Sequence, residues 1–116
     1  CNFANADMVG HTGDLGAAVE AMRALDHCIE RVLQAAESNG FGVLMSADHG
    51  NIEQMRTDEG KPHTQHTIGP VPVALIGMGA ASVNEGALCD IAPTILDHMG
   101  IETPAQMTGK SLLVRR

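Results

Sequence analysis

The stretch NGFGVLMSADHG, residues 39–50, decides the fold class because it joins the end of a helix to a strand and a polar loop. Asn39 and Gly40 form a helix stop, since glycine readily adopts the left-handed conformation that ends helices. The almost continuous apolar run of residues 41–46 is typical of a strand covered on both faces. Asp48 and His49 follow at the carboxyl end of this strand, where ligands gather in open α/β sheets.

A helix is predicted before this stretch, over residues 15–38. Its apolar side chains recur at three- and four-residue spacing, at Leu15, Val19, Met22, Ile29, Val32 and Ala36. Asp14 stands in the N-cap position of this helix. Residues 1–13 show no sustained period and contain two glycines, which predicts the tail of a strand running into a loop.

A second strand and a short helix are predicted downstream. Residues 51–69 form a polar loop, residues 71–76 form an apolar strand, and a glycine-rich connection follows over 77–86. Asp90 caps a short helix with Pro93 in its first turn and Gly100 at its end. Strands and helices in this order predict an α/β fold with a mostly parallel sheet.

So small a sheet requires neighbours, because buried parallel strands need adjacent strands and helices on both faces. We therefore expect residues 1–116 to form a single partial domain, a partial three-layer sandwich in which 101–116 is a tail. The chain begins with Cys1 rather than Met, which also predicts a fragment or a processed chain.

Composition excludes several classes of function. The 116 residues have a formal net charge of −7 and only two aromatic side chains, so neither phosphate attraction nor base stacking favours a nucleic-acid partner. Apolar stretches are broken well before the roughly 18 residues that a membrane span needs, so we expect no membrane partner. The three cysteines are an odd number without a C-x-x-C motif, which favours a reducing compartment, with the cytoplasm as the expected location.

Three pairs of polar residues fall in predicted loops and could share a metal ion, namely Asp7 with His11, Asp48 with His49, and His63 with His66. Carboxylate and imidazole ligands without thiolate suit Mn²⁺, Zn²⁺, Co²⁺ or Fe²⁺. The spacing of Asp7 and His11 is compatible with a tight loop or with a helical turn. Each of these side chains taken alone could equally be a solvated loop residue or a cap. The serines show no activating base and no G-x-S-x-G motif.

The order of residues in these motifs is more specific than the residue types they contain. Residues 5–13 (NADMVGHTG), 47–55 (ADHGNIEQM) and 62–67 (PHTQHT) closely resemble cofactor-independent, or 2,3-bisphosphoglycerate-independent, phosphoglycerate mutase. Residues 90–94 and 107–112 resemble the closing helix and tail of that family and of its alkaline phosphatase relatives. The resemblance covers nearly the whole chain and implies the C-terminal part of a phosphatase-like domain.

This resemblance implies an isomerase of glycolysis that interconverts 2- and 3-phosphoglycerate through a phosphoserine intermediate, with two Mn²⁺ ions, or Zn²⁺ or Co²⁺. Asp7, His11 and His66 resemble the ligands of one ion. Asp48 and His49 resemble half of the ligands of the other, and His63 lies beside the ligands or on the substrate side. No serine here matches the family's nucleophile, and the residues that bind the substrate are absent, so we predict that these 116 residues alone are inactive.

Two other hypotheses remain open. The chain could be a free-standing small metal-binding module, or one that completes a site in association with a partner. It could also be a truncated product that self-associates through exposed sheet edges, because unpaired strand edges invite pairing.

Overall fold

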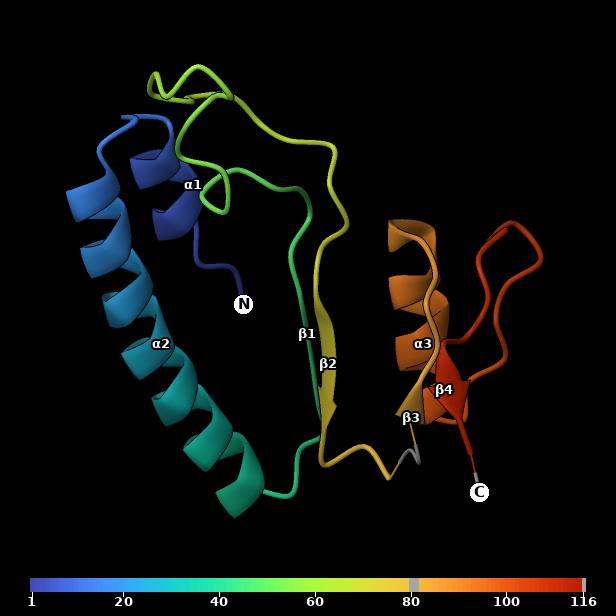
Figure 1. Ribbon diagram of the computed structural model, residues 1–116. Coiled ribbons are helices and arrows are strands. Elements are labelled where there is room, and N and C mark those ends of the chain that lie inside the picture. The colour runs from blue at the N-terminus through green and yellow to red at the C-terminus, as the bar shows by residue number, and fades with distance from the viewer. Residues whose placement is uncertain (80–81, 116) are drawn as a thin grey trace. The chain divides into compact units, whose positions relative to one another are not determined.

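The computed structural model describes residues 1–79 and 82–115 (Figure 1). Its elements are, in chain order, α1 (Asn5–Gly10), α2 (Leu15–Ser38), β1 (Val43–Ser46), β2 (Val73–Ile76), β3 (Ser82–Val83), the 3₁₀ turn η1 (Leu88–Asp90), α3 (Ile91–His98) and β4 (Leu113–Val114). The chain forms two compact units: unit 1 comprises Cys1–Ala35 and Ala47–Val71, and unit 2 comprises Ala36–Ser46 and Pro72–Arg116. The mixture of helices and strands agrees with the prediction.

Helix α2 spans the range predicted from its apolar period, and both of its ends follow local signals. The Asp14 carboxylate accepts a hydrogen bond from the backbone N–H of Ala17 at 3.0 Å, as an N-cap does. Beyond the helix, Gly40 has a φ of 71°, in the left-handed region that terminates helices. Among the residues described, no helix combines the length and the apolar character that crossing a membrane would require.

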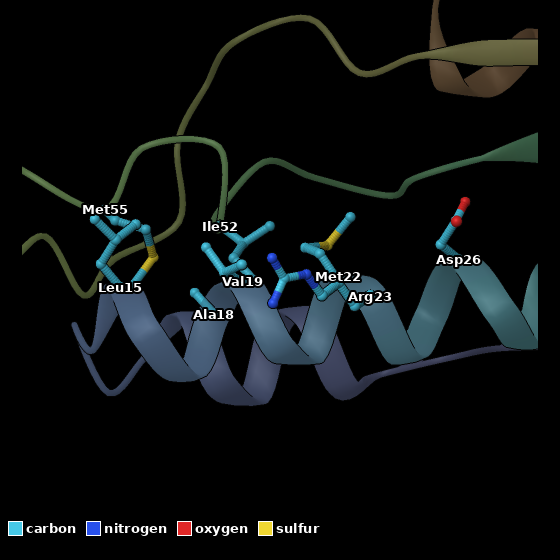
Figure 2. A pocket seen from close by; sticks show the side chains of 8 residues that line it. All are labelled: Leu15, Ala18, Val19, Met22, Arg23, Asp26, Ile52 and Met55. Carbon is cyan, nitrogen blue, oxygen red and sulfur yellow. The ribbon is translucent and has the colours of Figure 1, made fainter.

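An open groove of about 430 Å³ lies in unit 1 between α2 and residues 52–55 (Figure 2). Most of its lining is apolar, formed by Leu15, Ala18, Val19, Met22, Ile52 and Met55. Ala18 and Met55 are buried, whereas Leu15, Val19 and Met22 are between 42% and 48% exposed. The groove therefore offers apolar surface without a convergent set of ligand atoms.

Helix α1 corrects the prediction of a strand tail and loop for residues 1–13. Its six residues are too few to show a helical period, so no helix signal was visible in the sequence. Its last turn is satisfied locally, because the Thr12 hydroxyl donates to the carbonyl of Val9 at 2.6 Å. Its first turn is held from a distance, because Asn51 Nδ2 donates to the Asp7 carboxylate across 44 residues of sequence. A long-range contact therefore supports this helix.

The strands of unit 2 overturn the prediction of a mostly parallel sheet. β1 and β2 pair antiparallel, with Val43 opposite Ile76 and Ser46 opposite Val73, and β3 and β4 form a second antiparallel pair. Parallel neighbours require a crossover, usually a helix, that carries the chain back to the starting end of the first strand. Residues 47–72 contain no helix, and the chain re-enters at the end where β1 finished. The connection therefore makes the pair antiparallel.

Helix α3 lies where it was predicted, with Pro93 in its first turn and a left-handed Gly100 after its end. Asp90 occupies the N-cap position, but its side chain makes no bond to this helix. Its carboxylate instead accepts the backbone N–H groups of Ala87 and Lys110, both at 2.8 Å. These two donors hold the pKa of the Asp90 carboxyl below its ordinary value.

The C-terminal residues, predicted as loop and tail, contain β4 and are bonded to α3. The Thr94 hydroxyl is fully buried, donates to the Asp90 carbonyl at 2.6 Å and accepts the N–H of Leu112 at 3.0 Å. Arg115 Nη2 donates to the Asp97 carboxylate at 2.7 Å. Side chains of α3 thus attach the last strand, which pairs with β3 in the predicted glycine-rich connection.

Candidate metal centre

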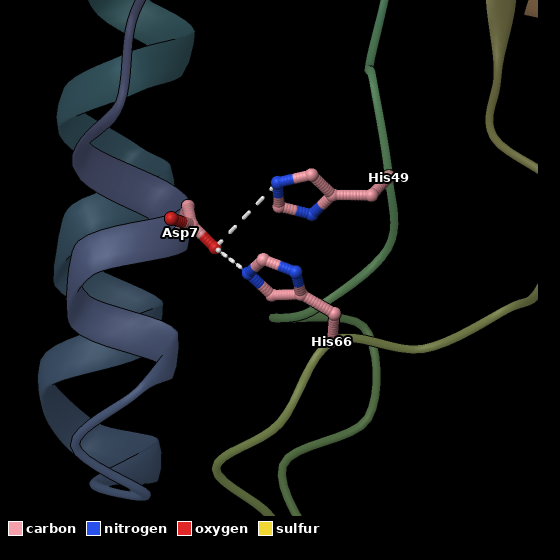
Figure 3. Close-up of side chains that lie close together, drawn as sticks. All are labelled: Asp7, His49 and His66. Atoms are coloured by element: carbon pink, nitrogen blue, oxygen red, sulfur yellow. Dashed lines mark ion pairs between the residues drawn. The ribbon is translucent and has the colours of Figure 1, made fainter.

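Four of the predicted ligands converge in unit 1. Asp7 lies in α1 and His11 directly follows it, while His49 and His66 lie in two loops of residues 47–71. Asp7 Oδ1 is 3.0 Å from His66 Nε2, 3.3 Å from His11 Nε2 and 4.0 Å from His49 Nε2. Figure 3 shows the Asp7 carboxylate facing the rings of His49 and His66. One carboxylate oxygen is therefore the common point of the cluster.

The α1 helix explains why Asp7 and His11 face the same point. Side chains four residues apart are neighbours on a helix surface. His11 is the C-cap of α1 and keeps helical backbone angles, so this relation extends to it. Of the two geometries that the spacing allowed, the structure has the helical turn.

Backbone carbonyls orient two of the imidazole rings. His11 Nδ1 lies 2.8 Å from the carbonyl oxygen of Thr64, and His49 Nδ1 lies 3.3 Å from that of Gly50. A carbonyl can only accept, so each Nδ1 carries a hydrogen, and in the neutral form of either ring Nε2 presents a lone pair. Both lone pairs are directed at the side where Asp7 lies. This is the arrangement in which histidine serves as a metal ligand.

The spacing of the rings is compatible with a cation shared among them. The rings of His49 and His66 are stacked with centroids 3.8 Å apart, and His11 Nε2 is 3.1 Å from His66 Nε2. In one tautomer His66 Nε2 donates to Asp7 Oδ1 at 3.0 Å, and in the other all three rings present Nε2 lone pairs beside this carboxylate. A single divalent ion would accept these lone pairs and balance the carboxylate. The donor set therefore fits a metal.

The chemistry of the donors narrows the kind of metal. Asp7, His49 and His66 each offer a ligand atom, and these atoms lie within 4.8 Å of one another. Carboxylate oxygen and imidazole nitrogen suit borderline divalent ions such as Mn²⁺, Co²⁺ and Zn²⁺. The side chains of His49 and His66 are 31% and 49% exposed, so an ion can reach them from solvent.

Asp7 is held in its ionised form mainly by an amide. Asn51 Nδ2 donates to Asp7 Oδ1 at 2.8 Å, and this hydrogen bond lowers the pKa of the Asp7 carboxyl most. Partial burial acts in the opposite direction, while the charges of His11, His66 and His49 lower the pKa further. The carboxylate is therefore available as an anionic ligand over the physiological pH range.

Asp48 and His63 are not among the side chains that converge on Asp7 Oδ1. The Asp48 side chain is 86% exposed, and its carboxylate is 3.7 Å from His49 Nε2. In the described residues His63 makes no ion pair with Asp7, and its Nδ1 is buried without a hydrogen-bond partner. His49 Nε2 thus lies near both aspartates, 3.7 Å from the carboxylate of Asp48, with which the resemblance pairs it, and 4.0 Å from that of Asp7.

Three residues of the site were not predicted, namely Asn51, Glu53 and Thr67. Asn51 is 5% exposed and binds Asp7, whereas Glu53 accepts hydrogen bonds from Asn51 and Thr67. All three lie within or next to the predicted motifs. Neither residue type nor spacing distinguishes them, because their partners are set by the folding of the loops.

Comparison with known proteins gives concordant results. The sequence model of the metalloenzyme superfamily matches residues 1–103. The chain is 53% identical, over 116 residues, to the 2,3-bisphosphoglycerate-independent phosphoglycerate mutases of Moorella thermoacetica and of Escherichia coli strain K12. In both cases the match covers 98% of this chain and 23% of the relative.

A solved structure supports the same relationship. The chain superimposes with a TM-score of 0.80 and 32% identity on a Leishmania mexicana phosphoglycerate mutase crystallised at low cobalt concentration. The match covers 99% of this chain and 24% of that one, so the chain spans about a quarter of the length of its relatives.

The resemblance seen in the three motifs is confirmed by these matches, and the relatives are phosphoglycerate mutases, which are isomerases. Because the matching family model covers most of its length, the chain belongs to the metalloenzyme superfamily.

Proposed function

We propose that these 116 residues are the C-terminal segment of a metal-dependent, 2,3-bisphosphoglycerate-independent phosphoglycerate mutase. The whole enzyme would interconvert 2- and 3-phosphoglycerate in glycolysis, in the cytoplasm. The observation that carries this proposal is the convergence of His11, His49 and His66 on one oxygen of Asp7, in a chain 53% identical to such mutases.

Asp7, His11 and His66 would hold one divalent ion, and Asp48 and His49 would supply part of the site for a second. Mn²⁺ is the proposed ion, with Co²⁺ or Zn²⁺ as substitutes that the same donors accept. When bound, such ions lower the pKa of a hydroxyl nucleophile and offset the negative charge of phosphoryl oxygens. The 4.0 Å between His49 Nε2 and Asp7 Oδ1 supports the proposal that the two ions would lie side by side.

The remaining parts of the reaction belong to the rest of the enzyme. The proposed route passes through a phosphoserine, yet no serine of these 116 residues matches the nucleophile motif of the family. We therefore propose that residues 1–116 form one part of a larger phosphatase-like, three-layer domain and do not turn over phosphoglycerate alone. A mutase assay of this chain with Mn²⁺ tests the point, and measurable turnover would contradict it.

A second candidate is a small metal-binding module that works by association with a partner. The observation that favours it is that Asp7, His11 and His66, the three residues proposed to hold one ion, all lie close together in unit 1. In this case the isolated chain retains a metal ion without the rest of a mutase.

The first test is a Mn²⁺ titration of the metal-free chain followed by electron paramagnetic resonance. We expect saturable binding that is lost in His66→Ala and retained in His27→Ala, because His27 is a solvent-exposed histidine of α2. Absence of saturable binding to the wild-type chain would contradict an autonomous site. Equal loss in both variants would contradict the ligand assignment.

A further inference from the structure

The carboxylate of Glu53 connects the two loops that present histidines to the candidate metal centre, with one oxygen bonded within its own loop and the other to the second loop. Oε2 accepts the backbone N–H of Asn51 at 2.6 Å, and Oε1 accepts the hydroxyl of Thr67. The same loops are joined by a backbone hydrogen bond from Thr67 N–H to the Gly50 carbonyl at 2.9 Å. His49 precedes Gly50 and His66 precedes Thr67, so each joined residue is next to a histidine of the cluster.

Asn51 extends this connection to α1. Its Nδ2 donates to Asp7 Oδ1 at 2.8 Å, which is the oxygen that lies 3.0 Å from His66 Nε2. Its side chain is nearly buried, so this contact cannot be exchanged freely for water. Through Asn51 and Glu53, the three chain segments that carry Asp7, His49 and His66 are linked by side-chain hydrogen bonds.

Two glycines make room for these links. A Cβ at Gly10 would lie 2.2 Å from Asn51 Oδ1, and a Cβ at Gly50 would lie 2.1 Å from the Thr67 hydroxyl and 2.2 Å from Glu53 Oε1. Neither glycine has a positive φ, so backbone conformation alone does not require glycine at these positions. The close approach of the linking side chains does require it.

We propose that Asn51, Glu53 and Thr67 form a positioning bracket that sets the separations between Asp7 and His66, proposed ligands of one divalent ion, and His49, a proposed ligand of the second. This inference rests on the proposed metal site but concerns residues that touch its ligands and not the ion. Such partners hold a ligand in one orientation, and their loss typically weakens metal binding by about 10- to 100-fold.

The decisive comparison is Thr67→Val against Thr67→Ser. Valine removes the hydroxyl that Glu53 accepts while the backbone bond to Gly50 stays possible, whereas serine keeps the hydroxyl. Glu53→Gln replaces one acceptor of the bracket by a donor. Glu59→Gln is the matched control, because in the described part of the chain the exposed Glu59 has no hydrogen bond or ion pair.

Nuclear magnetic resonance of the metal-free chain provides a readout that does not depend on metal binding. We expect the imidazole signals of His49 and His66 to shift in Thr67→Val and Glu53→Gln, and to stay in place in Thr67→Ser and Glu59→Gln. Mn²⁺ binding should weaken by about 10-fold or more in the first two variants only, while circular dichroism shows retained helix.

Two results of these measurements would overturn the bracket. Unchanged imidazole signals in both Thr67→Val and Glu53→Gln would overturn the bracket, as would loss of fold in both, which would make these residues supports of the loop and not of the ligands. If the wild-type chain binds no Mn²⁺, the proposed metal function of the chain fails, and the imidazole signals still decide whether the bracket positions the histidines.

Discussion

Asp7 in unit 1 and Asp90 in unit 2 are both aspartates whose pKa is lowered by hydrogen-bond donors, yet they differ in what surrounds them. The Asp90 carboxylate accepts two backbone N–H groups and the thiol of Cys89, all from nearby turns of its own unit. Asp7 accepts one amide and faces the Nε2 atoms of three imidazole rings. The first carboxylate is surrounded by donors of the chain itself, whereas the second would also bind a cation under the proposed metal function. This difference separates a structural carboxylate from a proposed ligand.

The largest expected effect comes from replacing the two aspartates that are compared, Asp7 and Asp90. Asp7→Asn should weaken Mn²⁺ binding by more than the about 100-fold that loss of a supporting residue can cost, because an amide oxygen replaces an anionic ligand. Asp90→Asn should leave the affinity unchanged and lower the Tm, because its NH₂ group would face a backbone donor. Mn²⁺ titration and thermal unfolding of both variants check this, and loss of affinity in Asp90→Asn would contradict the separation.

The next largest effect is expected at the buried hydroxyl of Thr94 in unit 2, where the free energy of unfolding is measured. Thr94→Val should lower the free energy of unfolding by about 1–3 kcal/mol, because the N–H of Leu112 is left buried without an acceptor. Thr108→Val, at an exposed position, should stay within about 0.5 kcal/mol of wild type. Urea denaturation measures both, and equal values for the two variants would contradict this account of the C-terminal attachment.

The pH dependence of unfolding should reveal how much the Asp90 carboxylate contributes to stability. Its pKa is lowered from 3.8 in the folded chain, so above pH 3.8 the carboxylate is charged in both states and its contribution to stability is fully present. As the pH falls below 3.8 towards the folded-state pKa, the unfolded chain binds the proton first and this contribution is lost. The urea midpoint should therefore fall with acid less steeply in Asp90→Asn than in wild type. Parallel curves would show that Asp90 does not contribute.

The smallest effect is expected at Asp48. Its side chain is largely exposed and meets the cluster only through a 3.7 Å contact with His49, so Asp48→Asn should change Mn²⁺ affinity of this chain by less than about 3-fold, within the range of an exposed ion pair. The titration used for Asp7→Asn measures this. Loss of binding in Asp48→Asn would mean that Asp48 and not His11 completes the site in the isolated chain.

The sequence by itself determined the elements whose signals are local. Helix α2, with its Asp14 cap and its left-handed Gly40, lies where the period and the caps predict it, and β1, β2 and α3 lie within their predicted ranges. The residues proposed as ligands could be selected because carboxylate and imidazole groups recur in loops and in specific motifs. Side-chain chemistry and short periods are properties of neighbours in the chain, so they can be read without a structure.

Only the tertiary structure decided how distant segments meet. Helix α1 is supported by a bond between Asp7 and Asn51, 44 residues apart, and β4 pairs with β3 across the length of α3. The antiparallel direction of β2 depends on the course of residues 47–72, and the grouping of His49 with Asp7 depends on how that segment folds back. Hydrogen bonds between remote residues leave no periodic trace in a sequence, because their partners are chosen by folding.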